Sequence, residues 1–194
     1  PKNNLFNTRV EIPLQFLITY KNDMEKLQKK VYKKYLDIFI KEIEIDKEES
    51  DKEAKITINK VKILTQISNI VYPSRKGYGK DGFSEVFSKS GTSKFKYKTN
   101  KPILHKDYIG NVSIKFKNIL NKIKSSEGII FIYSDYIWSG SVPLGIALEH
   151  LGFSKYGRKD LLDSKDKEEN LNYNMKKKSE LNEGEDFKQA NYII

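Results

Sequence analysis

The side chains that could do chemistry in this sequence are few and far apart. The two histidines, His105 and His150, lack partners at the spacing of a metal site. Asp160, Asp163 and Asp166 are evenly spaced, but the glycine and the final glutamate of a calcium loop are missing. No serine stands in a nucleophile elbow, and the absence of cysteine excludes thiolate nucleophiles and disulfides. We therefore predict structural or exposed histidines, no catalytic residue and no metal site.

A glycine-rich segment, GYGKDG at 77–82, matches the GxGxxG pattern of dinucleotide-binding loops. The pattern binds a pyrophosphate only where a strand leads into it and a helix begins at its last glycine. Here a helix that ends before Pro73 precedes it, and residues 83–87 are too few for the crossover helix. We therefore expect ordinary loop glycines. The chain also lacks a GxxxxGK[ST] loop, so it cannot bind and split a nucleoside triphosphate by that route.

Basic residues alternate with aromatic residues in the segment KFKYK at 94–98. This pattern could stack bases and hold phosphates. An edge strand with one solvated face gives the same pattern, so both interpretations stay open. The lysines at 29, 30, 33 and 34 could likewise meet phosphate, although a solvated helix face explains them equally simply.

The chain of 194 residues has 36 basic and 26 acidic side chains, a formal net charge of +10. This balance favours a polyanionic partner, nucleic acid or a membrane surface. Lysine, isoleucine and asparagine are abundant and arginine is scarce, so an AT-rich genome could also explain the charge. No signal peptide and no apolar run near the roughly 20 residues of a membrane helix is visible. We expect an intracellular protein that does not enter a membrane.

The elements that must position any site centre on residues 113–153. Ser113 can cap a helix whose apolar face is Phe116, Ile119, Leu120 and Ile123. The run GIIFIY at 128–133 is apolar without alternation, which predicts a strand buried on both faces of a parallel sheet. Ser141 can cap a second helix, with Pro143 in its first turn and Gly152 at its end. Its inward side chains are Leu144, Ala147, Leu148 and Leu151.

The other elements surround this unit. Residues 10–19 begin as a weak strand in which Pro13 indicates an edge or a bulge. A capping box of Asn22 and Glu25 predicts a helix as far as about residue 43, and a mobile loop is expected at 46–55. A second helix carries Val61, Leu64, Ile67, Ile70 and Val71 inward. Residues 154–187 are charged and predict a surface insertion or disorder, after which 189–194 begin the next strand.

Three phrases, in order along the chain, resemble those of superfamily 2 helicases of the Snf2/DEAD-like type. The run GIIFIYSDYIWSGSVPLGIALEHLGFSKYG at 128–157 looks like the strand and helix that open the second motor domain. MEKLQKKVYKKY at 24–35 resembles the helix that leaves the first motor domain. LTQISNIVYP at 64–73 resembles a further helix of the Snf2-like branch. The amino-acid sequence of these segments is most similar to that of helicases of nucleocytoplasmic large DNA viruses, the group related to poxvirus and African swine fever virus ATPases.

The resemblance implies an α/β fold, an incomplete RecA-like parallel sheet unit with preceding helices and long loops. Residues 1–73 would then end motor domain 1 and form a helical connection, and 74–112 would be a loop-rich linker. Residues 113–194 would begin the helicase C-terminal domain, with an insertion at 154–188. The chain begins at Pro1 and stops at Ile194, and we expect it to be a segment of a longer polypeptide.

The resemblance also implies a function, that of a fragment of an ATP-dependent helicase or translocase that contributes nucleic-acid binding and domain closure. In such motors the loop after the opening strand faces the nucleic-acid backbone. That role is carried here by Ser134, Asp135 and Tyr136, and more loosely by Trp138, which could stack on a base. Asp135 stands where glutamine is typical.

The partners implied are nucleic acid, DNA or RNA, and the remainder of the same polypeptide. No cofactor is expected in this segment, because ATP and magnesium belong to motifs of the full-length parent, so the segment alone should hydrolyse no ATP. The expected location is the viral factory in the host cytoplasm, or the virion. The alternative is a non-catalytic, basic nucleic-acid-binding or virion-associated α/β protein.

Overall fold

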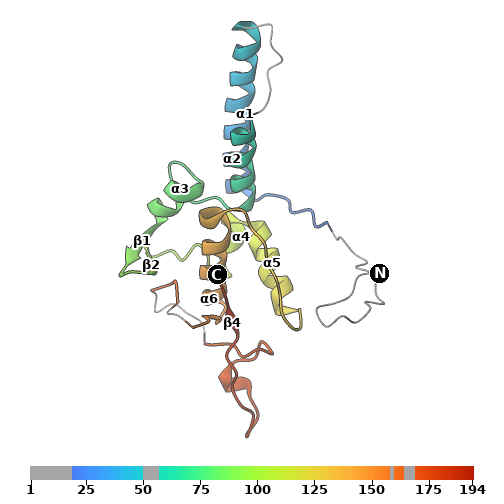
Figure 1. The fold of residues 1–194 in the computed structure, drawn as a ribbon, viewed down its shortest axis with the longest axis vertical. Coiled ribbons are helices and arrows are strands. Elements are labelled where there is room, and N and C mark those ends of the chain that lie inside the picture. Colours follow the sequence, from blue (N-terminus) through green and yellow to red (C-terminus); the bar gives the residue numbers. More distant parts are fainter. Residues whose placement is uncertain (1–18, 50–56, 158–159, 164–168) are drawn as a thin grey trace, which may run out of the picture.

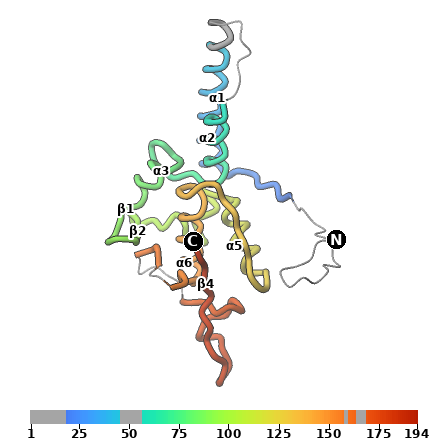
Figure 2. Tube along the Cα trace, in the orientation of Figure 1, coloured from blue at the N-terminus to red at the C-terminus, as the bar shows by residue number. Residues whose placement is uncertain are grey.

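The computed structural model describes residues 19–49, 57–157, 160–163 and 169–194, which form a mixed fold of helices and small sheets (Figure 1). The predicted strand at 10–19 lies almost wholly outside these residues. The predicted loop at 46–55 is wrong for residues 46–49, which belong to the first helix, and its remainder lies outside the described residues. Helices α1 (Lys26–Glu49) and α2 (Ile58–Asn69) lie side by side and project from the rest of the molecule (Figures 1 and 2). Both helices were predicted, and α1 continues six residues beyond the expected end at 43.

The base of this helical pair is fixed by a buried glutamine. The Gln28 Nε2 donates to the carbonyl oxygens of Ile67 and Ser68, at 2.9 Å each. The predicted capping box at Asn22 is wrong, because α1 begins only at Lys26. The Asn22 side chain instead accepts a hydrogen bond from Asn118 Nδ2 at 2.6 Å, which ties the start of the described chain to the next helical layer.

The segment 74–112, expected to be rich in loops, contains short elements. Helix α3 (Gly79–Val86) leads directly into strand β1 (Phe87–Ser90), which pairs antiparallel with β2 (Lys94–Tyr97). Helix α4 (Ile109–Val112) precedes α5 (Ile114–Lys124). The prediction for α5 is confirmed: Ser113 Oγ accepts from the Phe116 amide at 3.0 Å, and Phe116, Leu120 and Ile123 are buried.

Helix α6 (Val142–His150) is the centre of the molecule, preceded by a π-helical turn, η1 (Ile137–Ser141). The predicted inward residues of α6 are buried, and so is every residue from Pro143 to His150. The predicted cap at Ser141 is wrong, because Ser141 has helical dihedral angles and its side chain caps nothing. Gly152 ends the helix with φ +100°, where a Cβ atom would lie 2.5 Å from the Glu169 carbonyl oxygen.

After α6 the chain forms a second, parallel pair of strands. Strand β3 (Ser154–Lys155) pairs with β4 (Asn191–Tyr192), so the predicted strand near 189–194 exists but is short. The short 3-10 helix η2 (Lys178–Glu180) lies between them. The expected insertion at 154–188 is partly built into the core, because Leu161, Leu162 and Leu171 are buried.

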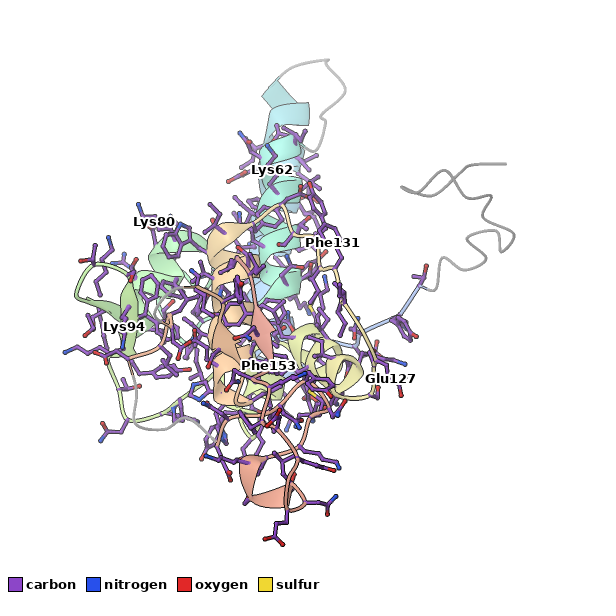
Figure 3. The ribbon with its side chains drawn as sticks, turned by 60° about the horizontal axis from the view of Figure 1, so that its bottom comes forward. Lys62, Lys80, Lys94, Glu127, Phe131 and Phe153 are labelled. Atoms are coloured by element: carbon purple, nitrogen blue, oxygen red, sulfur yellow. The ribbon has the colours of Figure 1, made fainter. Side chains whose placement is uncertain are left out.

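The predicted buried strand at residues 129–133 is the main error of the sequence analysis. These residues belong to no strand, and none of their backbone groups has a backbone partner among the described residues. They run as an exposed stretch from the end of α5 towards η1 (Figure 1). Figure 3 places Phe131 on this outer stretch and Phe153 in the middle of the molecule. Burial of a strand requires neighbouring strands, and the described residues supply none to this stretch.

No described helix combines the length and the apolar character needed to cross a bilayer. One cluster of buried apolar side chains runs from Ile70 to Ala190, so the expected linker at 74–112 and the expected domain at 113–194 share one hydrophobic core. The domain boundaries at 73 and 112 remain predictions. The structure establishes a mixed helix and strand fold with small sheets.

Candidate nucleic-acid interface

The predicted interface residues lie on a tight turn between the exposed stretch and α6. The Ser141 amide donates to the Tyr136 carbonyl oxygen at 3.0 Å, which closes the π-helical turn. Ser134 Oγ accepts from the Tyr136 amide at 3.3 Å. A Cβ atom at Gly140 would lie 2.0 Å from Ser134 Oγ, so only glycine lets the two ends of the turn approach this closely.

The inner side of the turn rests on α2 and α3. Ser139 is fully buried, and its Oγ accepts from the Gly79 amide at 3.1 Å and donates to Gln66 Oε1 at 3.4 Å. The Tyr72 hydroxyl donates to the Trp138 carbonyl oxygen. These contacts hold the turn in one position, which is the condition for a preorganised binding surface.

The contact between Gly79 and Ser139 also shows what the glycine-rich segment 77–82 does in the fold. A loop and not a strand leads into it, and α3 begins at Gly79, the second glycine of the pattern. The Gly79 N–H, which a pyrophosphate would need, donates to Ser139. Gly77 lies in a loop, but Gly79 and Gly82 belong to α3, so the expectation of ordinary loop glycines is wrong for two of the three.

Trp138 packs inward. Its ring lies 5.0 Å from the ring of Phe83 and 6.1 Å from that of Phe95, as measured between centroids. The contacts form one aromatic cluster with the rest of the core. These contacts explain the position of the Trp138 ring without a ligand. Stacking of Trp138 on a base stays a prediction.

Ser134, Asp135 and Tyr136 come together on the outer side of the turn. Asp135 is exposed, and Tyr136 and Ser134 are half-buried. The Tyr133 hydroxyl donates to Asp135 Oδ1 at 2.5 Å, and this hydrogen bond raises the pKa of Tyr133. The outer side therefore presents a hydroxyl, an aromatic ring and one carboxylate, and only the carboxylate opposes a phosphate.

Lys80 follows Gly79, whose amide is bonded to the turn, and the lysine is exposed. Figure 3 shows Lys80 and Lys94 on the side of the molecule formed by α3 and the β1–β2 hairpin. Sequence reasoning overlooked Lys80 because its proximity to residue 139 depends on the tertiary fold.

The KFKYK segment forms β2, and its two aromatic rings face inward. Phe95 packs 5.1 Å from Phe83, and Tyr97 packs 4.6 Å from Phe87, between ring centroids. Lys98 Nζ donates to the Ser84 carbonyl oxygen at 2.7 Å. These contacts favour the second of the two interpretations, a strand with one solvated face, because the rings already pack in the core.

A buried carboxylate, Glu149, was overlooked by the sequence analysis. Its two oxygens accept from the Leu161 and Leu162 amides, at 2.6 Å each, and Oε1 also accepts from the Tyr192 hydroxyl at 2.5 Å. Burial, and then the charge of Glu149, raise the pKa of Tyr192. The signal in the sequence was a carboxylate in a helix that is otherwise apolar, which requires buried donors. Glu149 thus anchors the 160–162 loop and β4 to α6.

The histidines have structural surroundings, as expected. His150 is fully buried in α6, and its Nε2 lies 2.9 Å from the Tyr97 hydroxyl. The His105 ring meets the His150 ring edge to face, with centroids 5.5 Å apart. Within the described ranges no group of three histidine, cysteine or acidic side chains could hold a metal ion.

Comparison of the chain with protein-family models, with curated proteins and with solved structures found no match. The candidate interface is therefore defined by its own geometry: a rigid turn with an exposed polar edge and a neighbouring lysine.

Proposed function

We propose that this chain is part of an ATP-dependent helicase or translocase of superfamily 2, of the type found in large DNA viruses. In this proposal it joins two motor domains and opens the second, RecA-like one. It contributes nucleic-acid contact and domain closure, whereas other parts of the parent polypeptide hold ATP and magnesium.

One observation supports the proposal more than any other: the order of elements from α5 to β4. Helix α5 is followed by an apolar stretch, a rigid turn, the buried helix α6 and a parallel pair of strands. Parallel strands require a crossover, usually helical, and ligands of open α/β sheets bind beyond the carboxyl ends of the strands. In this structure residues 129–133 belong to no strand, so the position of the turn at 134–140 beyond the carboxyl end of a sheet strand is part of the proposal.

The charge of the chain is consistent with a nucleic-acid partner. Its net charge of +10 favours phosphate, and the exposed Lys80 follows Gly79, whose amide donates to Ser139 in the turn. Asp135 opposes contact with a phosphate directly beside it, so we assign the backbone contact to Ser134, Tyr136 and Lys80. In this proposal the polar edge of the turn positions the nucleic-acid strand, and the net positive charge of the chain attracts that strand.

The experiment is a binding titration of a fluorescent single-stranded oligonucleotide at several salt concentrations. Lys80→Ala should weaken binding by about twofold and Asp135→Asn should strengthen it by about twofold, since each exposed charge contributes roughly 0.5 kcal/mol. Tyr136→Ala should weaken binding several-fold, because a ring stacked on a base contributes about 1–3 kcal/mol. Exposed residues away from the turn provide matched controls: Lys62→Ala, Tyr173→Ala and Asp107→Asn. Equal effects of the turn and control variants would contradict the assigned interface.

The second candidate is a basic nucleic-acid-binding or virion-associated protein without a motor. The net charge favours it independently of the turn, because charge alone produces salt-dependent, non-specific binding. The parent reading frame separates the two candidates. A motor requires GxxxxGK[ST] and an aspartate-glutamate box upstream, and QxxGRxxR downstream. Their absence would reject the motor.

A further inference from the structure

The exposed stretch 129–133 has the properties of a strand without a partner. The exposed fractions of its side chains alternate: 102% for Ile129, 41% for Ile130, 88% for Phe131, 40% for Ile132 and 76% for Tyr133. An alternation with a period of two residues is typical of extended backbone. Ile130 and Ile132 therefore point to one side of the stretch, and the other three to the opposite side.

A hollow of about 490 Å³ lies on the side of Ile130 and Ile132. Its floor is a face of α5 that carries Ile119, the edge of the buried Ile123 and several polar side chains, and most of its exposed surface is apolar. The polar side chains are those of Lys115, Asn118, Asn121 and Lys122. Its remaining wall is the segment 20–22, which opens the described part of the chain. The chain before Tyr20 is thus connected next to Ile130 and Ile132.

The sequence before Tyr20 matches this hollow. In VEIPLQFLI at 10–18 every even position is apolar: Val10, Ile12, Leu14, Phe16 and Ile18. Three of the four odd positions are Glu11, Pro13 and Gln15. This pattern is that of a strand with one buried face, and a proline is accommodated at a sheet edge. Nine residues at about 3.3 Å each span about 30 Å, more than the length of residues 129–133.

We propose that residues 10–18 of this chain bind as a β-strand along residues 129–133, with their even-numbered side chains in the hollow over α5. Backbone hydrogen bonds along the stretch then satisfy the N–H and C=O groups that have no backbone partner among the described residues. The apolar side chains cover Ile119, Ile123, Ile130 and Ile132. This strand addition is independent of the nucleic-acid role proposed above.

Cysteine cross-linking tests the proposal directly, since the chain contains no cysteine. Ile130→Cys is combined in turn with Leu14→Cys, Phe16→Cys and Ile18→Cys, and for control with Gln15→Cys and Leu17→Cys. Facing side chains of paired strands lie within disulfide distance, and side chains of opposite faces do not. Under mild oxidation at least one even-position pair should form an intramolecular disulfide about tenfold faster than either odd-position pair. Equal rates, or disulfides only between chains, would overturn the proposal, the latter assigning the groove to a second copy.

Hydrogen exchange tests the same proposal without cysteine pairs, which could impair folding. In the full chain the amides of 129–133 should exchange hydrogen about tenfold more slowly than unprotected amides. Leu14→Asp with Phe16→Asp should abolish this protection, and Gln15→Asp should retain it. Unprotected exchange in the unmodified chain would overturn the proposal, as would protection that survives the double variant.

Discussion

Helix α6 and residues 129–133 are adjacent apolar segments with opposite surroundings. Every residue from Pro143 to His150 is buried, whereas Ile129, Phe131 and Tyr133 are among the most exposed apolar side chains described. A helix satisfies its backbone internally and needs only a surface to cover, whereas an extended segment must also find backbone partners. Apolar character alone therefore predicts burial for a helix better than for a strand.

The largest effect should come from the anchor of α6. Glu149→Ala removes the acceptors of two buried amides and of Tyr192, and should lower the free energy of unfolding by about 4 kcal/mol. Urea denaturation measures the change. Glu149→Gln, which keeps one carbonyl oxygen, should cost less, and the exposed Glu127→Ala should stay within about 0.5 kcal/mol. A loss at Glu149 as small as that at Glu127 would show that α6 is not anchored in this way.

Truncating one apolar side chain in α6 and one in residues 129–133 measures the difference in burial between the two segments. Leu144→Ala in α6 should lower the free energy of unfolding by about 3 kcal/mol, because it leaves a cavity in the core. Phe131→Ala should change it by less than about 0.5 kcal/mol, because the ring is 88% exposed. The comparison fails if both variants lose the same free energy under matched denaturation conditions.

The turn between the two segments should respond to a single methyl group. Gly140→Ala places a Cβ atom against Ser134 Oγ and should cost about 2 kcal/mol through overpacking. In a Ser134→Ala background, which removes the Oγ, the cost should be smaller. A double-mutant cycle by chemical denaturation gives the coupling free energy between Gly140 and Ser134. A coupling free energy of zero would show that the added methyl group does not meet the Ser134 side chain.

The smallest effect is a dependence on alkaline pH. Burial raises the pKa values of Tyr72 and Tyr192 above the ordinary value of 10.0. Their contribution to stability is complete below about pH 10 and declines above it, by up to about 1.4 kcal/mol per pH unit for each tyrosine, because only the unfolded chain ionises. Tyr192→Phe should reduce the slope of the free energy of unfolding against pH. An unchanged slope would contradict burial of the neutral phenol.

The sequence predicted the elements governed by local patterns. The cap and apolar spacing of α5 and the position of α6 depend on neighbours a few residues apart, and the structure confirms them. The inward stripe predicted for α2 is only partly confirmed, because Ile67 is buried, Val61 is exposed, and Ile70 and Val71 follow the end of the helix. Residues 129–133 were misassigned because the burial of a strand depends on segments distant in sequence. The anchor at Glu149 and the contact of Gly79 with Ser139 were overlooked for the same reason, because each contact joins residues that come together only in the folded chain.

The candidate interface was predictable only in part. Ser134, Asp135 and Tyr136 were chosen because the helicase resemblance assigns nucleic-acid contact to the loop after the opening strand, and the structure joins Ser134 and Tyr136 by a hydrogen bond. The sequence did not indicate that Trp138 packs against Phe83, or that Gly79, the residue before Lys80, contacts the turn. Composition reports the charge of a chain but not where tertiary packing places it.

The central claim is that residues 129–133 are an extended segment for which the described chain provides no strand partner. Hydrogen exchange in a chain lacking residues 1–18 tests it most directly. The account predicts nearly unprotected amides at 129–133 beside amides of α6 that exchange at least about a hundredfold more slowly. Equal protection of the two segments in that shortened chain would contradict the account.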